Sequence, residues 1–187
     1  MRSGIVLAAL AAGLTCVAPP ATAKIRVMNE HAASAMLGQL EEVDFETFAP
    51  NEALSNPLTL LGVTFTDPYR MASGFCSSPT CEVDPDNPNG GNIELYLNPG
   101  ATIVFEQPEP VVVLDVQGMG DNAIVLIVTE GDGGTEVVTS EGRLFGVTLI
   151  GLAAPSGIAA IQVQSVGGTG GPLTLARVLY TRDKGPR

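Results

Sequence analysis

The chain has 187 residues, of which 20 are Asp or Glu and 9 are Lys or Arg, so its formal net charge at pH 7 is −11. This length fits one domain with a buried core. Such an acidic surface repels phosphate groups, which argues against nucleic acid and anionic lipid as electrostatic partners.

The first 23 residues have the pattern of a secretory signal peptide. Arg2 supplies a positive charge, residues 5–17 form a largely apolar run, and Ala21 and Ala23 are small residues at the positions that a signal peptidase reads. The run is too short to span a bilayer, and no later stretch has the ~18–20 apolar residues of a membrane helix. We therefore expect cleavage after Ala23 and a secreted protein, extracellular or periplasmic, without a membrane span.

Residues 24–40 carry the least clear signal. Asn29 can cap a short helix that begins at Glu30 and that Gly38 ends, whereas a loosely held leader fits the same residues. The only histidine, His31, falls here, but Ser–His catalysis needs a histidine that the core holds beside its serine. We therefore expect an exposed or locally capping His31 and no Ser–His site.

Strand patterns begin at residue 41. Val43 and Phe45 alternate with Asp44 and Glu46, and a second run, rich in apolar residues, covers residues 58–66. Residues 67–92 then show little periodicity and many Pro, Gly, Asn, Asp and Ser residues. Because long connections in compact domains are often functional, we expect this one to present the site of the protein.

Two cysteines, Cys76 and Cys81, lie in this connection and are the only ones that remain after signal cleavage. In an oxidising compartment their spacing is typical of a local disulfide, which would shape the loop. A metal site is the competing interpretation, but two cysteines and one distant histidine provide fewer than four ligands. We predict the disulfide, which leaves no thiolate for catalysis.

Candidate oxygen ligands for a metal ion lie a few residues after Cys81. Asp84, Asp86 and Asn89 offer the carboxylate and amide oxygens that calcium prefers, although an ordinary acidic loop is the alternative. Tyr69 and Tyr96 flank the connection and can contact a sugar ring, whereas in the alternative interpretation they cover the ends of a sheet. These residues are our candidate metal and ligand sites.

The second half consists of short apolar runs at spacings typical of a sandwich. Residues 123–128 are rich in β-branched side chains and predict a buried central strand, and the glycines of residues 130–134 predict a hairpin turn. The other runs cover residues 93–97, 102–106, 111–116, 136–139, 143–152, 158–166 and 173–181. We therefore predict an all-β fold, an antiparallel two-sheet β-sandwich of the jelly-roll type, over residues 41–182, with a short polar tail at 183–187.

A family resemblance rests on two stretches. Val-Asp-Phe-Glu at residues 43–46, followed by Leu-Gly-Val-Thr-Phe at residues 61–65, resembles the opening of small secreted bacterial jelly-roll proteins of the PEP-CTERM-associated type. Residues 111–116 and 173–180 look like the matching half of a galactose-binding-like sandwich. In such folds the last strand often carries acidic residues of a structural calcium site, and here Ala176 and Arg177 stand in those places.

The resemblance and the loop chemistry together favour a secreted, non-catalytic binding or surface-matrix module. Its expected ligand is an extracellular glycan or surface polymer, bound by Tyr69 or Tyr96 with calcium held by Asp84, Asp86 and Asn89. The first alternative is an extracellular carbohydrate-active enzyme, a hydrolase or lyase, although no catalytic constellation is recognisable. The second is a structural protein that self-associates through its edge strands.

Overall fold

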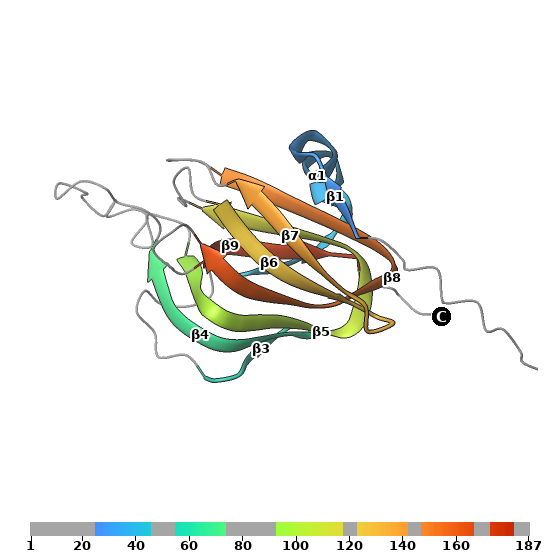
Figure 1. Cartoon of the computed structure of the whole chain (residues 1–187). Helices are drawn as coiled ribbons and strands as arrows, with labels where there is room; N and C mark the ends of the chain where they lie inside the picture. Colours follow the sequence, from blue (N-terminus) through green and yellow to red (C-terminus); the bar gives the residue numbers. More distant parts are fainter. Residues whose placement is uncertain are drawn as a thin grey trace, which may run out of the picture.

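The computed structural model describes residues 25–45, 55–73, 93–117, 123–141, 147–166 and 173–181. These residues form an all-β fold with a single short α-helix, as the sequence predicts at this level (Figure 1). The elements are β1 (Arg26–Met28), α1 (Glu30–Met36), a 3-10 turn (Leu37–Gln39), β2 (Glu41–Asp44), β3 (Leu58–Leu60), β4 (Val63–Ser73), β5 (Ile93–Gln117), β6 (Ala123–Glu130), β7 (Thr135–Glu141), β8 (Val147–Val166) and β9 (Leu173–Tyr180).

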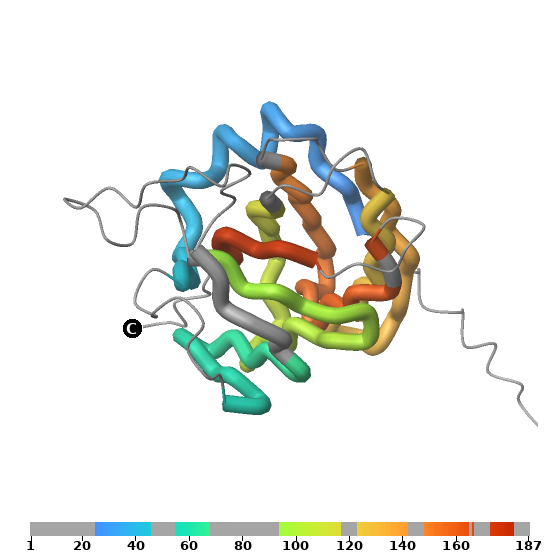
Figure 2. Tube along the Cα trace, turned by 90° about the vertical axis from the view of Figure 1, so that its left-hand side faces the viewer, coloured from blue at the N-terminus to red at the C-terminus, as the bar shows by residue number. Residues whose placement is uncertain are grey.

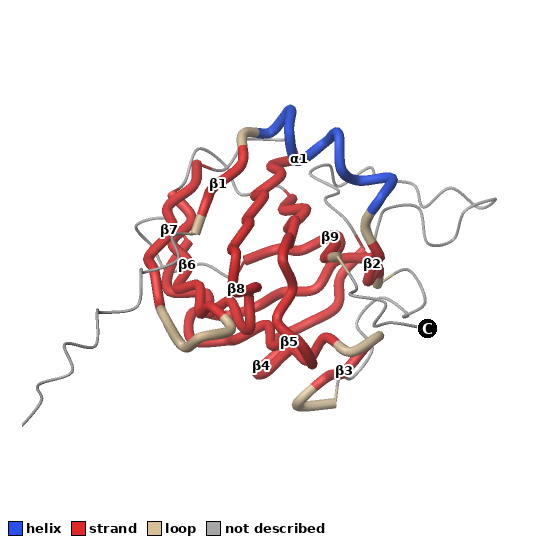
Figure 3. The backbone as a smooth tube through the Cα atoms, turned by 90° about the vertical axis from the view of Figure 1, so that its right-hand side faces the viewer, coloured by secondary structure: helices blue, strands red, loops and turns tan. Residues whose placement is uncertain are grey.

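All nine strands belong to one hydrogen-bonded sheet, which is mostly antiparallel. Its main path runs β2-β9-β5-β8-β6-β7, while β4 also pairs with β5, β3 with β4, and β1 with β8. Seen from two opposite sides, the strands curve around a common interior (Figures 2 and 3). Apolar side chains from almost every strand fill that interior, and they include the T-shaped ring pair of Phe45 and Phe65, with ring centroids 5.6 Å apart.

Two strands are much longer than predicted. β5 has 25 residues and β8 has 20, so the runs predicted at 93–97, 102–106 and 111–116 are one strand. β8 likewise joins the run at 158–166 to residues 147–152, the described part of the run at 143–152. The two strands pair over residues 102–104 of β5 and again over residues 111–117, with register shifts between. Pro108 and Pro110 lie at these shifts, where the ladder does not need their missing N–H groups, so they bend β5 without ending it.

Local turns divide the expected runs differently. Residues 58–66 form a hairpin of β3 and β4, because Leu61 and Gly62 turn the chain with φ of 49° and 81°. The predicted turn after Glu130 is confirmed, with Gly133 at φ 89° between β6 and β7. β6, the predicted buried central strand, pairs with β8 on one side and β7 on the other, and it buries one face only, because buried and half-buried residues alternate along it.

The expected long connection is shorter than its composition indicates. β4 continues to Ser73 by pairing with β5, so residues 67–73 are strand and not loop. Asp67 has a φ of 49°, which accounts for the loss of a regular pattern there, and its carboxylate accepts a hydrogen bond from the Asn56 amide at 2.7 Å. Residues 74–92 lie outside the described residues.

The segment that begins at residue 25 packs on the sheet. β1 pairs with β8, and the Asn29 side chain accepts a hydrogen bond from the backbone N–H of Ala32, so the predicted N-cap is confirmed. Ala33 of α1 packs with Val113 and Leu179 in a second apolar cluster, distinct from the main core, and His31 is exposed. A short helix over residues 30–36 therefore replaces the alternative of a loose leader. In the described part of the chain, no helix is long and apolar enough to cross a membrane.

Candidate functional site

Most of the predicted site residues fall on undescribed parts of the chain. Cys76, Cys81, Asp84, Asp86 and Asn89 lie outside the described residues, so the disulfide and the calcium site stay predictions. Of the two tyrosines, Tyr69 lies in residues 68–73 of β4, for which the structure describes the backbone only, and Tyr96 is half-buried in β5.

A charged cluster lies on the outer side of the sheet, where β2, β5 and β9 are neighbours. The Arg177 guanidinium donates from Nε to Asp115 Oδ2 at 2.8 Å and from its Nη1 atom to Glu42 Oε1 at 3.2 Å. The Asp115 side chain is 4% exposed, whereas those of Arg177 and Glu42 are 34% and 39% exposed. Arg177 thus pairs with the buried carboxylate of Asp115 and with the solvent-accessible carboxylate of Glu42. The hydrogen bond to Asp115 raises the pKa of Arg177.

A bulge in β9 places the Arg177 side chain on the outer side of the sheet, beside Asp115. Arg177 lies opposite Asp115 and Leu175 opposite Val116, so Ala176 is an extra residue in the ladder between β9 and β5. Such a bulge changes which face of the sheet the following residues point to. Leu175 and Val178 both reach the main core, and Arg177 between them points outward. A regular strand would have turned the arginine into the core with Leu175.

Glu94 completes the cluster from the beginning of β5. It is 3% exposed, and burial raises its pKa to about 7, with a further contribution from the negative charge of Asp115. Asp115 forms the ion pair with Arg177, whereas burial disfavours the charged form of Glu94. The second carboxylate oxygen of Asp115, Oδ1, is buried and accepts no hydrogen bond from the residues that the structure describes. The two carboxyl groups therefore differ in their surroundings, since Asp115 is paired with a cation and Glu94 is held by burial.

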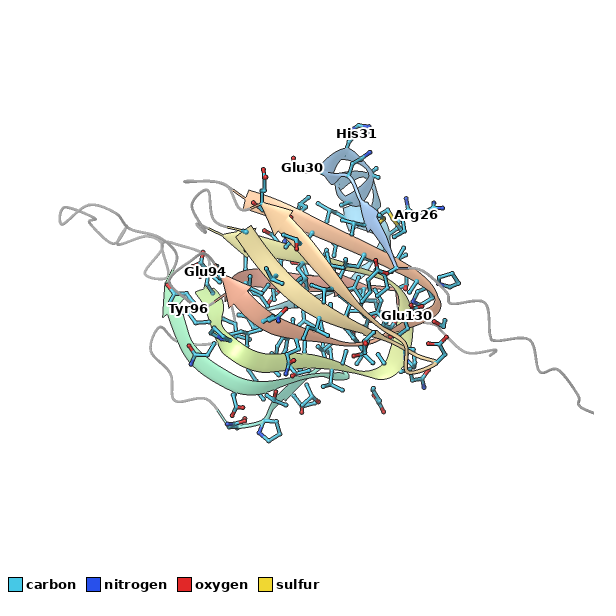
Figure 4. The ribbon with its side chains drawn as sticks, viewed as in Figure 1. Arg26, Glu30, His31, Glu94, Tyr96 and Glu130 are labelled. Atoms are coloured by element: carbon cyan, nitrogen blue, oxygen red, sulfur yellow. The ribbon has the colours of Figure 1, made fainter. Side chains whose placement is uncertain are left out.

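Tyr96 is the sequence-predicted residue that lies beside Glu94 on β5. It lies two residues from Glu94 on the same face of β5 and opposite Thr174 of β9, and it makes interactions of its own. Figure 4 shows Glu94 and Tyr96 together at one end of the sheet. We name Glu42, Glu94, Tyr96, Asp115 and Arg177 the Arg177 cluster.

Sequence analysis did not identify Glu42, Glu94, Asp115 or Arg177 as site residues. The signal was present in Asp115 and Arg177, each of which is the one charge in a mostly apolar run, at residues 111–116 and 173–180 respectively. Their pairing depends on the order of β9 and β5 in the sheet and on the bulge at Ala176, and neither follows from local pattern.

Glu130, another buried carboxylate, lies at the opposite end of the molecule (Figure 4). Its Oε2 accepts a hydrogen bond from the Ser156 hydroxyl at 2.7 Å, and the backbone of Gly131 donates to the Gly157 carbonyl. These contacts join the hairpin of β6 and β7 to the bend of β8, so Glu130 has a structural role. A shallow cavity of about 310 Å³ beside β1 is lined by Arg26, Pro110 and the Ala153–Pro155 stretch, and it carries one charge only.

The Arg177 cluster suits binding better than covalent chemistry. Glu94 and Asp115 are both nearly inaccessible, so neither carboxyl group reaches a substrate directly. The accessible groups are the arginine fork and the Glu42 carboxylate, which offer hydrogen-bond donors and acceptors in a fixed geometry. Within the described ranges no three His, Cys, Asp or Glu residues come together as a metal site. No protein-family model, curated protein or solved structure matches this chain.

Proposed function

We propose that this protein is a secreted, non-catalytic binding module whose ligand is an extracellular glycan or surface polymer, bound at the Arg177 cluster. The observation that carries the proposal is the orientation of Arg177. Two carboxylates hold its guanidinium on different sides, and a third of the side chain remains exposed to a ligand.

The surrounding groups fit a polyhydroxylated ligand. Sugar hydroxyls both donate and accept hydrogen bonds, and the exposed guanidinium and Glu42 carboxylate provide the complementary donors and acceptors. Tyr96 adds an aromatic ring two residues from Glu94 on the same strand. Sites of this kind commonly combine apolar or aromatic contact with a few polar groups that set orientation.

The finer fold belongs to the same proposal. Long strands that bend and pair twice, as β5 and β8 do, support an arrangement in which two layers share strands at a corner. We propose that the layers are those of a jelly-roll-like sandwich, with the Arg177 cluster on the outer side of one of them.

The test is a glycan array probed with purified residues 24–187, once with calcium and once with EDTA. The informative variant is Arg177→Lys, which keeps a positive charge beside Asp115 but lacks the planar fork. The matched control is Glu141→Gln, a change of an exposed carboxylate at the end of β7. Thermal melting of each variant separates loss of binding from loss of folding.

The proposal is supported if Arg177→Lys weakens binding by about tenfold or more while Glu141→Gln leaves binding unchanged. A tenfold loss of affinity corresponds to about 1.4 kcal/mol of binding free energy. Binding that disappears in EDTA also supports calcium assistance. A wild-type protein that binds no glycan under either condition contradicts the proposed ligand. Turnover of a polysaccharide identifies the enzyme alternative instead.

A further inference from the structure

A second part of the outer surface of the sheet is lined by uncharged side chains. Neighbouring strands in the order β4, β5, β8, β6 and β7 present two rows of outward side chains, which the strand registers align. We call this surface the threonine face; its rows are Thr64, Val104, Ala160, Thr129 and Thr135, and Thr66, Thr102, Gln162, Ile127 and Val137. All ten side chains are half-buried or exposed, and the alternate residues of the same strands point into the core.

The absence of charge on this face limits what it can bind. The chain has 20 acidic residues and a net charge of −11, yet none of the ten residues is ionisable. Polyanions are repelled by the rest of the molecule, and the two rows offer polycations no carboxylate of their own, although the exposed Glu106 lies two residues beyond Val104 on β5. An uncharged partner meets neither obstacle.

The size of the face argues against a protein partner. Five strands spaced about 4.8 Å apart span roughly 19 Å, and residues two apart along a strand lie about 7 Å from each other. The two rows themselves therefore cover roughly 130 Å², against the roughly 800 Å² that each partner buries in a stable protein–protein interface. A single extended polymer chain, in contrast, can cross all five strands.

The chemistry of the face fits a neutral polysaccharide. Threonine hydroxyls and the Gln162 amide donate and accept hydrogen bonds, while threonine methyl groups, Val104 and Val137 contact apolar ring faces. Some of these groups are already held in place: the Thr66 hydroxyl accepts from the Thr102 N–H at 2.9 Å, and the Gln162 amide donates to the Gly100 carbonyl at 3.3 Å. Val137 and Val104 are 60% and 37% exposed, so their apolar surface is accessible.

The face is continuous with the Arg177 cluster along β5. Glu94, Tyr96, Thr102 and Val104 lie on the same outward side of that strand, since the odd-numbered residues Leu95, Leu97, Ile103 and Phe105 point into the core. We propose that the threonine face is an extended binding surface for a neutral, linear polysaccharide. This inference rests on the proposed function and adds to it the location and the charge class of the polymer.

The experiment is a pull-down of residues 24–187 with three probes: insoluble cellulose, insoluble chitin and the anionic polymer polygalacturonate. The test variant combines Val104→Glu and Val137→Glu, which place two carboxylates on exposed positions of the face. The control is Val27→Glu, because Val27 of β1 is 50% exposed and lies outside the face. Sedimentation velocity without polymer determines the oligomeric state of each protein.

We expect the wild type to be retained on cellulose or chitin and the double variant to be retained at least about tenfold less, because a charge on a desolvated contact is costly. Val27→Glu should be retained like the wild type. Equal retention of wild type and double variant overturns the inference, as does binding to polygalacturonate alone or to no probe. A wild-type dimer that becomes monomeric in the double variant also overturns it and makes the face a self-association surface. If Arg177→Lys abolishes array binding while the double variant binds normally, the proposed function stands and only this extension fails.

Discussion

The Glu94 carboxyl group makes folding stability depend on pH. Its pKa is 4.5 when exposed and about 7 in the folded protein, so between these values the unfolded chain loses the proton first. The contribution of Glu94 to the free energy of unfolding is therefore highest below pH 4.5. It falls as the pH rises to 7 and is constant above that. Glu94→Gln removes the ionisation and should raise stability at pH 8 while changing little at pH 4.5.

The size of the effect follows from the pKa shift. A change from 4.5 to about 7 corresponds to about 3 kcal/mol at full strength. The cluster borders solvent through Arg177 and Glu42, and screening reduces the value to roughly 1–2 kcal/mol. Such a gain at pH 8 should raise the Tm of Glu94→Gln by about 2–8 °C for a chain of this size.

Urea denaturation of wild type and Glu94→Gln at pH 4.5, 6 and 8 measures the difference directly. Glu106→Gln is the control, since Glu106 lies on the same strand and is exposed. A gain that is equal at all three pH values, or one that Glu106→Gln reproduces, would refute the assignment to a buried Glu94 beside Asp115. A gain that grows as the pH falls would show that the sign is wrong.

Further predictions concern the packing, the turns and the undescribed connection. Gly151→Val should destabilise the protein by about 2–3 kcal/mol in urea denaturation, because a Cβ there would lie 2.7 Å from Met28 Cε and 3.0 Å from Ala33 Cβ. Leu61→Asn should raise stability by about 0.5–1 kcal/mol in the same assay, since asparagine adopts a φ near 49° more easily than leucine; an unchanged midpoint would contradict this. Tyr180→Phe should cost about 1 kcal/mol, because the hydroxyl donates to the Leu61 carbonyl at 2.6 Å. If the predicted calcium site exists, calcium should raise the Tm of wild type over that in EDTA, and combined Asp84→Ala and Asp86→Ala should abolish this increase.

The sequence predicts those features that short-range chemistry determines. The all-β class, the Asn29 cap and the glycine turn between β6 and β7 follow from periodicity and from residues that cap or turn the backbone. Strand continuity could not be predicted the same way. Pro108, Pro110 and Gly100 normally end a strand, but here neighbours in the sheet continue β5 through all three positions. Leu61 shows the opposite: leucine is not a typical turn residue, but here it lies in the turn between β3 and β4.

The Arg177 cluster was predicted only in part, because it too depends on which strands are neighbours in the sheet. Tyr96 stands out as an aromatic residue beside a long connection, and it lies in the cluster. Arg177 meets Asp115 and Glu42 across 62 and 135 residues of sequence, through a register that one extra residue in β9 sets. Such pairings depend on tertiary structure, which single-strand patterns do not encode.

The order of strand pairing has a consequence for how the chain folds. β1 pairs with β8 and β2 with β9, so Arg26 lies opposite Ala153 and Glu41 opposite Tyr180. Contacts of such high sequence separation form late and make folding slow, because a long loop must close before they stabilise anything. During synthesis, β1 therefore stays unpaired until β8 has emerged, and β2 stays unpaired until β9 has emerged. We therefore expect slow folding, and we expect a chain truncated before Leu173 to leave β2 without its partner strand and β5 without one of its neighbours.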